Sequence, residues 1–330
     1  MSRSAMLSRA WSVAAIIMCA GVPLAAVAQG AAWPTKPVKF VVPFPPGGSV
    51  DPLARLLGVR LADSLGQPFI IENKTGASGA IGTAFVAKSP PDGYTYAVVF
   101  DTHAVNPALN PDLQFDTVKD LAPVMLVGTA PMVIVTQTGK PYKTIDDVIR
   151  AAKARPEALS IGSVGNGSLG HLAMILVQQS GGFRLTHVPY KGGGPMMQDA
   201  IGGQIELGIA SVAAVAANVK GGKLRAVVTT GDARTPVLPD VPTLAEQGFP
   251  GFSAFAWWGI FAPAGTPKPI LDRLHAELVK ALNQPDLRKQ LTETLGMDLA
   301  VSTPEALQKF LVGEIGRWGK VVKDNNVRAD

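Results

Sequence analysis

The sequence predicts an α/β fold of two lobes that are joined by two long extended segments. Strand-like and helix-like patterns alternate along most of the 330 residues, and this alternation favours largely parallel sheets covered by helices. Two apolar stretches, residues 121–136 and 252–263, interrupt the alternation, and we expect both to be extended crossovers between the lobes. Two crossovers form a hinge, and ligands of such folds bind between the lobes, at the C-terminal ends of strands.

The individual elements follow from hydrophobic periodicity and from local signals for helix starts and turns. The expected strands are residues 38–42, 69–72, 94–100, 159–164, 185–190, 205–210 and 224–230. The expected helices are residues 52–65, a segment ending at 87, 144–154, 168–179, 195–201, 212–219, 267–282 and 303–322. Residues 101–107 are expected to form a loop, and Thr144 with Asp147 has the pattern of a capping box.

The order of these elements suggests that one domain is inserted into the other. We expect domain 1 to hold residues 33–125 and 258–330, and domain 2 to hold residues 126–257. The roughly 300 residues from position 33 onward are also enough for two domains.

The first 28 residues have the pattern of a secretory signal peptide. Arg3 and Arg9 precede an apolar run, and the small residues at 26–28 form a cleavage site. We therefore expect cleavage after Ala28, with an uncleaved membrane anchor as the alternative. Cleavage removes Cys19, the single cysteine, so the exported chain is expected to have no thiol, no disulfide and no cysteine-bound metal.

The charge pattern argues against a nucleic-acid partner. The formal net charge is +5 at pH 7, and the basic residues are scattered, with no Lys/Arg run and no interleaved aromatic residues. Beyond the leader, no apolar run approaches the length of about 20 residues that a membrane-spanning helix needs. We therefore expect neither nucleic-acid binding nor a membrane span in the exported chain.

A loop rich in proline and glycine, residues 43–49 (the first loop), connects the first strand to the first helix. We expect Asp51 to cap that helix and Pro52 to occupy its first position. Gly47 and Gly48 leave the backbone bare, so a small group can approach its N–H groups. The helix N-terminus behind them is partly positive. Such a loop can hold an anion without a basic side chain.

Two later glycine-rich segments have the same character. Residues 76–80 (the second loop) open the next helix with a hydroxyl from Ser78, and residues 163–171 (the third loop) lie between a strand and a helix. The third loop has the G-x-G-x-x-G spacing of a dinucleotide site, but the following strand has no acidic residue, which argues against a dinucleotide. We expect these neutral loops to close on a carboxylate from both lobes.

The serine and histidine residues leave alternatives open. An exported hydrolase would use Ser168 or Ser49 with His171, although Asn166 replaces the first glycine of the G-x-S-x-G motif. His171 either lines the site or holds the third loop through a hydrogen bond. No histidine pair has metal-ligand spacing, so no metal site is expected. The tryptophan pair at 257–258 is expected to pack in the core or at the hinge.

Taken together, these motifs resemble those of the Bug family of extracytoplasmic solute receptors, which serve tripartite tricarboxylate transporters. The matching segments lie in order along nearly the whole exported chain. They are Trp33-Pro34-x-Lys36-Pro37, Pro43-Phe44-x-Pro46-Gly47-Gly48-Ser49-x-Asp51, Glu72-Asn73-Lys74-x-Gly76-Ala77-x-Gly79, Pro91-Asp92-Gly93-Tyr94, His103-x-x-Asn106-Pro107, Gly165-Asn166-Gly167-Ser168-x-x-His171, His187-Val188-Pro189-Tyr190-Lys191-Gly192, Leu238-Pro239-Asp240-Val241-Pro242-Thr243 and Phe261-Ala262-Pro263-Ala264-Gly265-Thr266-Pro267.

The resemblance implies a two-lobed periplasmic-binding-protein (Venus-flytrap) fold with two mostly parallel sheets, and neither catalytic activity nor a cofactor. It implies a periplasmic receptor that holds a small organic carboxylate and passes it to membrane transporter subunits. A sensory receptor that presents its ligand-bound form to a signalling partner would use the same fold and stays an alternative. We expect a monomer.

The binding residues implied by the resemblance come from both domains. Domain 1 is expected to contribute Phe44, Gly48, Ser49, Gly76, Ser78, Gly79 and Thr102, and domain 2 to contribute Ser163, Asn166, Gly167 and Ser168. His171 is a further candidate from its place at the end of the third loop. The family often has an acidic residue where this chain has Ala210, and such an acid would suit a ligand ammonium group. Its absence favours simple carboxylates over amino acids.

Overall fold

The computed structural model describes residues 33–329 of the chain. The expected signal peptide, residues 1–28, lies outside the described residues. The strands are β1 (Val38–Val42), β2 (Phe69–Asn73), β3 (Thr95–Phe100), β4 (Leu121–Gln137), β5 (Ser160–Ser163), β6 (Thr186–Pro189), β7 (Leu207–Ser211), β8 (Leu224–Thr229), β9 (Phe255–Pro263) and β10 (Asp298–Leu299). The α-helices are α1 (Val50–Leu65), α2 (Ala80–Ala87), α3 (Thr102–Leu109), α4 (Ile145–Ala154), α5 (Leu169–Gly181), α6 (Gly193–Ile201), α7 (Val212–Lys220), α8 (Lys268–Leu282), α9 (Pro285–Lys289) and α10 (Pro304–Asp324). Short 3₁₀ helices span Ala77–Gly79 and Ala245–Gln247, and a π-helical turn spans Gln290–Thr294.

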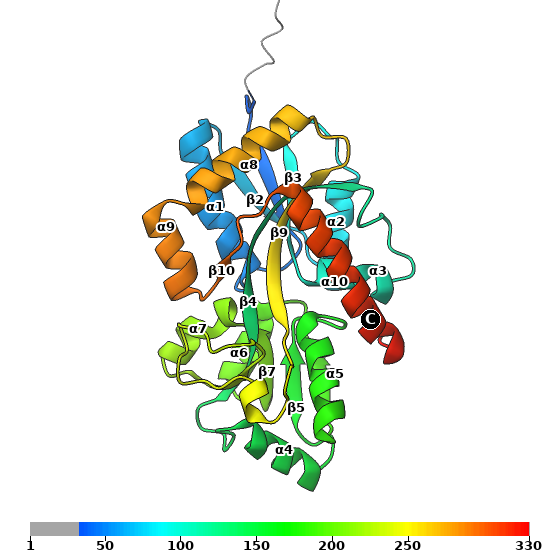
Figure 1. The fold of residues 1–330 in the computed structure, drawn as a ribbon, viewed down its shortest axis with the longest axis vertical. Helices are drawn as coiled ribbons and strands as arrows, with labels where there is room; N and C mark the ends of the chain where they lie inside the picture. The colour runs from blue at the N-terminus through cyan, green and yellow to red at the C-terminus, as the bar shows by residue number, and fades with distance from the viewer. Residues whose placement is uncertain (1–32, 330) are drawn as a thin grey trace, which may run out of the picture. The chain divides into compact units, whose positions relative to one another are not determined.

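Two sheets share the long strand β4 (Figure 1). The first sheet has the order β2-β1-β3-β9-β4, and β10 also pairs with β4. In the second sheet β4 pairs with β7 and β8, and β7 continues to β5 and then β6. The pairs β1–β2, β1–β3, β5–β6 and β5–β7 are parallel, as expected. Because the chain crosses on β4 and returns on β9, these strands run antiparallel to their neighbours, and both sheets are mixed rather than mostly parallel.

The two predicted crossovers are confirmed as the long strands β4 and β9. They lie side by side in Figure 1, paired from Leu121 with Pro263 to Pro131 with Phe255. At the next residue, Met132, β4 changes its partner from β9 to β7. Proline has no N–H for a ladder hydrogen bond, so Pro131 suits the point where the partner changes.

Each sheet has its own apolar core. We call the first sheet with α1–α3 and α8–α10 the first lobe, and the second sheet with α4–α7 the second lobe. The core of the first lobe includes Val41, Ala97, Val99, Trp257, Phe261, Leu307 and Leu311. The core of the second lobe includes Val133, Val135, Met196, Ile205, Val212, Val215 and Leu224. The residue boundaries of the two domains stay a prediction.

The helix-start signals are confirmed at α4 and α10 and are wrong at α1. The Asp147 backbone N–H donates to Thr144 Oγ1 at 3.2 Å, and the Asp147 carboxylate accepts from the Thr144 N–H at 3.0 Å, which completes the capping box. Thr303 caps α10 through its side chain. Asp51 is not the cap of α1, because the helix begins at Val50 and Asp51 lies in its first turn.

The predicted loop at 101–107 is also wrong, because most of it forms α3. Proline lacks a backbone donor and is unfavourable inside a helix, yet Pro107 lies within α3. However, Ala104, Val105 and Leu109 are buried, and α3 packs against α10. Burial of an amphipathic face commonly outweighs local propensity. The short elements α9, β10 and the π-helical turn were not predicted.

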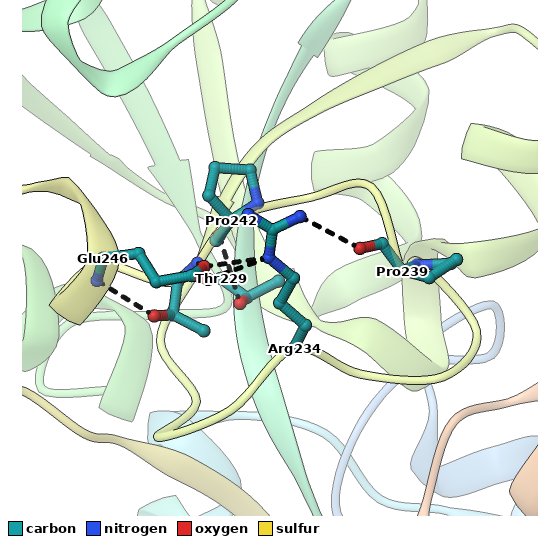
Figure 2. Close-up of polar contacts among 6 residues, drawn as sticks. Thr229, Arg234, Pro239, Pro242 and Glu246 are labelled. Carbon is teal, nitrogen blue, oxygen red and sulfur yellow. Dashed lines mark hydrogen bonds and ion pairs between the residues drawn. The ribbon is translucent and has the colours of Figure 1, made fainter.

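The segment after β8 is held by a polar network around Arg234 (Figure 2). Arg234 Nε donates to both carboxylate oxygens of Glu246 at 3.0 Å, and Arg234 Nη1 donates to Pro239 O at 3.3 Å. Pro242 O accepts from the Thr229 N–H at 2.9 Å. These bonds fix the proline-rich motif at 238–243 against the end of β8, so we assign that motif a structural role.

Candidate functional site

The first loop ends at Ser49, whose hydroxyl is held by a buried tryptophan. Ser49 is the N-cap of α1, but its side chain makes no capping hydrogen bond. Instead, Trp258 Nε1 donates to Ser49 Oγ at 3.2 Å. A hydroxyl oxygen that accepts keeps its own hydrogen to donate, so Ser49 can donate to a carboxylate oxygen. From the sequence we expected Trp258 only to pack in the core or at the hinge. Its role as a hydrogen-bond donor could have been inferred, because a buried indole N–H needs an acceptor.

Asp51 fixes the shape of the first loop through two partners. Arg55 Nε and Nη2 donate to its carboxylate at 2.9 and 3.0 Å. Asn73 Nδ2 donates both to Asp51 Oδ1 and to Phe44 O at 2.9 Å. Burial raises the pKa of Asp51, but the hydrogen bonds from Arg55 and Asn73 outweigh burial and lower the pKa. The carboxylate is therefore charged and paired, and it supports the loop from inside the first lobe.

A small uncharged cavity lies between the two lobes. The cavity has a volume of about 20 Å³. This is room for about one water molecule. It is lined by Phe44, Pro45, Gly48, Ser49, Val50 and Phe100 of the first lobe and by Val164, Gly193, Ala210, Ser211 and Ala214 of the second lobe. No lining residue carries a charge. Phe44, Gly48 and Ser49 are the predicted binding residues that the structure places at this cavity.

An aromatic group forms one wall of the cavity. The ring of Phe44 meets Phe100 edge-on, with ring centroids 5.9 Å apart. The ring centroid of Phe100 in turn lies 5.5 Å from that of Trp258. Packed aromatic rings form a rigid apolar surface, so this wall suits the hydrocarbon part of a ligand.

The second loop connects the lobes rather than lining the cavity. Positive φ angles occur at four successive residues of this loop, Gly76, Ala77, Ser78 and Gly79. A positive φ is unusual for residues other than glycine, here Ala77 and Ser78. Ser78 Oγ donates to Asn166 O of the third loop at 3.0 Å, and Asn106 Nδ2 donates to Ser78 O at 3.3 Å. Holding two residues in this conformation costs roughly 1–3 kcal/mol each, and the contacts of Ser78 stabilise it.

The hydroxyls of the third loop form a buried network. Ser163 Oγ lies 2.7 Å from His187 Nε2, and Ser168 Oγ donates to Ser163 Oγ at 3.2 Å. Burial lowers the pKa of His187 to about 4, so this ring is neutral at neutral pH. The Gly167 N–H donates to His171 Nδ1 at 3.1 Å. The structure therefore shows the loop-holding hydrogen bond that was one of the two alternatives for His171, and whether His171 also lines the site stays a prediction.

This network bears on the hydrolase alternative. In a nucleophile–base pair, the serine hydroxyl bonds to the imidazole ring. Here Ser168 Oγ bonds to Ser163 Oγ, and only the backbone N–H of His171 reaches Ser168 Oγ, at 3.4 Å. In this arrangement Ser168 is fully buried, and the hydrolase stays an alternative.

The backbones of the two lobes touch beside the cavity. A Cβ on Gly48 would lie 3.7 Å from Gly193 N, and a Cβ on Gly194 would overlap Pro46 O and lie 3.3 Å from Gly47 Cα. Glycines on both sides permit this close approach. The lobes are therefore in a closed arrangement.

Thr102 lies at the start of α3, next to Asp101. The carboxyl group of Asp101 is buried, and it was not identified from the sequence. Asp101 and Thr102 are each 2% exposed. Burial raises the pKa of Asp101 well above its ordinary value, and Glu314 adds to the rise, while the N–H groups of Leu169 and Thr102 oppose it. Leu169 opens α5 of the second lobe, so Asp101 lies where the lobes meet. Like Gly76, Gly79 and Asn166, Thr102 does not line the cavity.

Comparison with known proteins identifies the family. The profile of the family described as tripartite tricarboxylate transporter family receptor matches residues 53–327. The chain belongs to this family. BugT of Bordetella pertussis is 36% identical over 317 residues, which cover 94% of this chain and 96% of BugT. The solved structure of the periplasmic binding protein BugD has a TM-score of 0.85 at 32% identity and covers 90% of this chain and 99% of BugD. MatC of Rhodopseudomonas palustris, solved with bound malate, has a TM-score of 0.83 at 36% identity and covers 88% of this chain and 100% of MatC.

These similarities confirm the resemblance to the Bug family and the two-lobed fold of periplasmic binding proteins. This tripartite tricarboxylate receptor is a solute-binding protein. Between residues 33 and 329, no helix combines the length and the apolar character that crossing a bilayer requires.

Proposed function

We propose that this receptor captures a small organic carboxylate between its lobes in the periplasm and delivers it, without catalysis, to the membrane subunits of a tripartite tricarboxylate-type transporter. The observation that carries the proposal is the uncharged cavity between the lobes, with Ser49 free to donate and the N-terminus of α1 behind it. The malate bound to MatC supports a carboxylate as the ligand class.

Neutral donors are strong enough for this task. Each hydrogen bond to a charged group contributes about 1.5–3 kcal/mol net. Three or four such bonds, with the helix N-terminus, offset the costs of association and give about micromolar affinity, near −8 kcal/mol. The cavity holds about one water, so the lobes must separate for an acid to enter, and β4 and β9 are the strands that connect them.

The predicted binding residues then divide into three roles. Phe44, Gly48 and Ser49 contact the ligand directly. Ser78, Asn166 and Gly167 lie at the contact between the closed lobes, with Gly76, Gly79 and Thr102 shaping the first-lobe backbone beside it, and Ser163, Ser168 and His171 keep the third loop in shape. In this proposal the hinge separates residues 33–125 and 258–330 from residues 126–257, the leader is cleaved after Ala28, and the receptor acts as a monomer.

A thermal-shift screen of purified residues 29–330 tests the proposal. The panel contains mono-, di- and tricarboxylates, amino acids and aromatic acids, and the protein is first unfolded and refolded to remove any acid that was purified with it. A ligand present at 100 times its Kd stabilises the folded state by about 2.7 kcal/mol, so at least one simple acid should raise the melting midpoint. Ser49→Ala should reduce that shift. A panel with no shift, or a shift with amino acids alone, would contradict the proposal.

Uptake measurements separate the transporter role from the sensory alternative. Cells that lack this receptor should lose uptake of the labelled acid that gives the shift, and the intact gene should restore it. Normal uptake without the receptor would favour the sensory role. Turnover of model esters that is lost in Ser168→Ala would instead support the hydrolase.

A further inference from the structure

A surface groove joins the second lobe to the C-terminal end of α10. Its volume is about 680 Å³. Most of its lining belongs to the second lobe, where it comes from α4, from α5 and from the segments that follow them. Asn325, which follows α10, completes the lining from the first lobe. Figure 1 shows the C-terminal end of α10 beside α5. The groove is therefore built from both lobes, and its residues are distinct from those that line the cavity.

One polar contact closes the groove on the side of the first lobe. Asn325 Nδ2 donates to Val321 O at 2.9 Å, which orients the amide of Asn325 against its own helix. Gln179 Nε2 of α5 then donates to Asn325 Oδ1. Because Gln179 and Asn325 belong to different lobes, separation of the lobes would move Asn325 away from α5. The groove therefore has this shape only when the lobes are closed.

The charged side chains of the groove are basic. Lys153 in the last turn of α4 and Arg184 between α5 and β6 line it, and no acidic residue does so in the described part of the chain. Both residues are exposed, and neither forms an ion pair with another described residue. Two cations without counter-charges attract an acidic partner and speed its encounter with the receptor.

The floor of the groove is apolar. Phe183 lines it and is 5% exposed, and half-buried Ile175 of α5 lines it as well. The side chain of Gln178 is already used, because it donates to Met174 O at 3.0 Å and accepts from the Leu185 N–H at 2.6 Å. An apolar floor can receive one hydrophobic side chain as an anchor. A small ligand is commonly enclosed over most of its surface, whereas this groove has an exposed rim, which suits a segment of a larger partner.

We propose that this groove docks an acidic segment of the transporter's membrane subunits, one that also carries a hydrophobic side chain, and that closure of the lobes completes the docking surface. The inference rests on the proposed function and specifies where the partner binds. The carboxylates of the segment pair with Lys153 and Arg184, and its hydrophobic side chain contacts Phe183. A small polar contact is usually weak and short-lived, which suits a receptor that must leave after delivery.

Transport measurements with charge-reversed receptors test this inference. Lys153→Glu combined with Arg184→Glu should lower uptake of the labelled acid at least tenfold at equal receptor level, because two attractive charge pairs become repulsive. The Kd of this variant for the acid, measured by calorimetric titration, should stay within twofold of the wild type, since neither residue lines the cavity. Membrane vesicles that contain the transporter subunits should bind the wild-type receptor more when the acid is present and less at high salt.

Arg288→Glu combined with Lys309→Glu is the matched control. Both residues are exposed on helices of the first lobe, and neither lines the groove or forms an ion pair with another described residue. This double variant should keep uptake within twofold of the wild type. A cation also suits the last turn of α4, so the melting midpoint of each variant is measured. If the reversed variant is unfolded, Lys153→Gln with Arg184→Gln takes its place and should lower uptake at least threefold.

The outcomes separate this inference from the proposed function. Normal uptake with the reversed groove, an equal loss in the control variant, or a loss that matches a weaker Kd for the acid would overturn the inference while carboxylate capture stands. Vesicle binding that is the same with and without the acid would overturn the role of closure. If cells without the receptor keep normal uptake, or if no acid binds, the proposed function fails as well.

Discussion

Gly194→Ala should hinder closure of the lobes without harming the fold. Gly194 lies in the first turn of α6 in the second lobe, and a Cβ there would overlap Pro46 O and approach Gly47 Cα to 3.3 Å. Both neighbours are backbone atoms of the first loop, so they cannot rotate away as a side chain would. The overlap exists only when the lobes meet, because the contact joins different lobes.

The size of the effect follows from the packing. Forcing an extra methyl group into a well-packed contact costs about 1–3 kcal/mol, which corresponds to roughly a 5- to 160-fold weaker Kd. The ligand-free receptor can remain open, and alanine is favoured over glycine in a helix by about 0.5–1 kcal/mol. The melting midpoint without ligand should therefore stay the same or rise while ligand affinity falls.

The assay is calorimetric titration with the acid that gives the largest thermal shift, alongside melting of the ligand-free protein. Gly316→Ala is the matched control, because Gly316 lies within α10 and a Cβ there has nothing within 4 Å. It should leave the Kd unchanged. A Kd for Gly194→Ala within twofold of the wild type would refute the reasoning that ligand binding requires this closed contact.

Two further predictions concern buried side chains. Trp258→Phe should weaken ligand binding about 10-fold, because it removes the indole donor that orients Ser49. The neighbouring Trp257 is equally buried, but its Nε1 has no hydrogen-bond partner among the described residues. Trp257→Phe should therefore lower the free energy of unfolding in urea while leaving ligand affinity unchanged. If both tryptophan variants lost the same ligand affinity, the role of the Trp258 hydrogen bond would be contradicted. Asp101→Asn should stabilise the receptor at neutral pH by about 1–3 kcal/mol, because it removes a buried ionisable group. The folded-state pKa of Asp101 is raised, so its wild-type penalty is absent below the ordinary pKa of 3.8, grows as pH rises from there to the folded-state value, and is constant above it. Urea unfolding should therefore show variant and wild type converging at acid pH, and a gap that is constant with pH would contradict burial as the cause.

Elements whose signal is local were predictable from the sequence. β4 and β9 are long apolar stretches without a helical period, and their extended form follows from that pattern. The capping box at Thr144 is confirmed, because both of its residues are neighbours in the chain. α3 was missed, because burial against α10, distant in sequence, outweighs the unfavourable Pro107.

The candidate site was predictable only in outline. The first loop and Ser49 were identified from glycine, proline and a helix start, and these residues lie at the cavity. The third loop was expected to face a ligand, yet Ser168 bonds to Ser163 and Ser163 bonds to His187, a network that only the folded chain reveals. Ser211 was not singled out because it ends the apolar strand β7, and the lack of a hydrogen-bond partner for its buried hydroxyl among the described residues is apparent only in the folded structure.

A crystal structure of the receptor with its tightest-binding acid tests the central claim most directly. We predict a carboxylate in the cavity between the lobes, with an oxygen accepting from Ser49 Oγ and no lysine or arginine within hydrogen-bond distance. A ligand bound outside this cavity, or a carboxylate paired with a basic side chain, would contradict capture by neutral donors between the lobes.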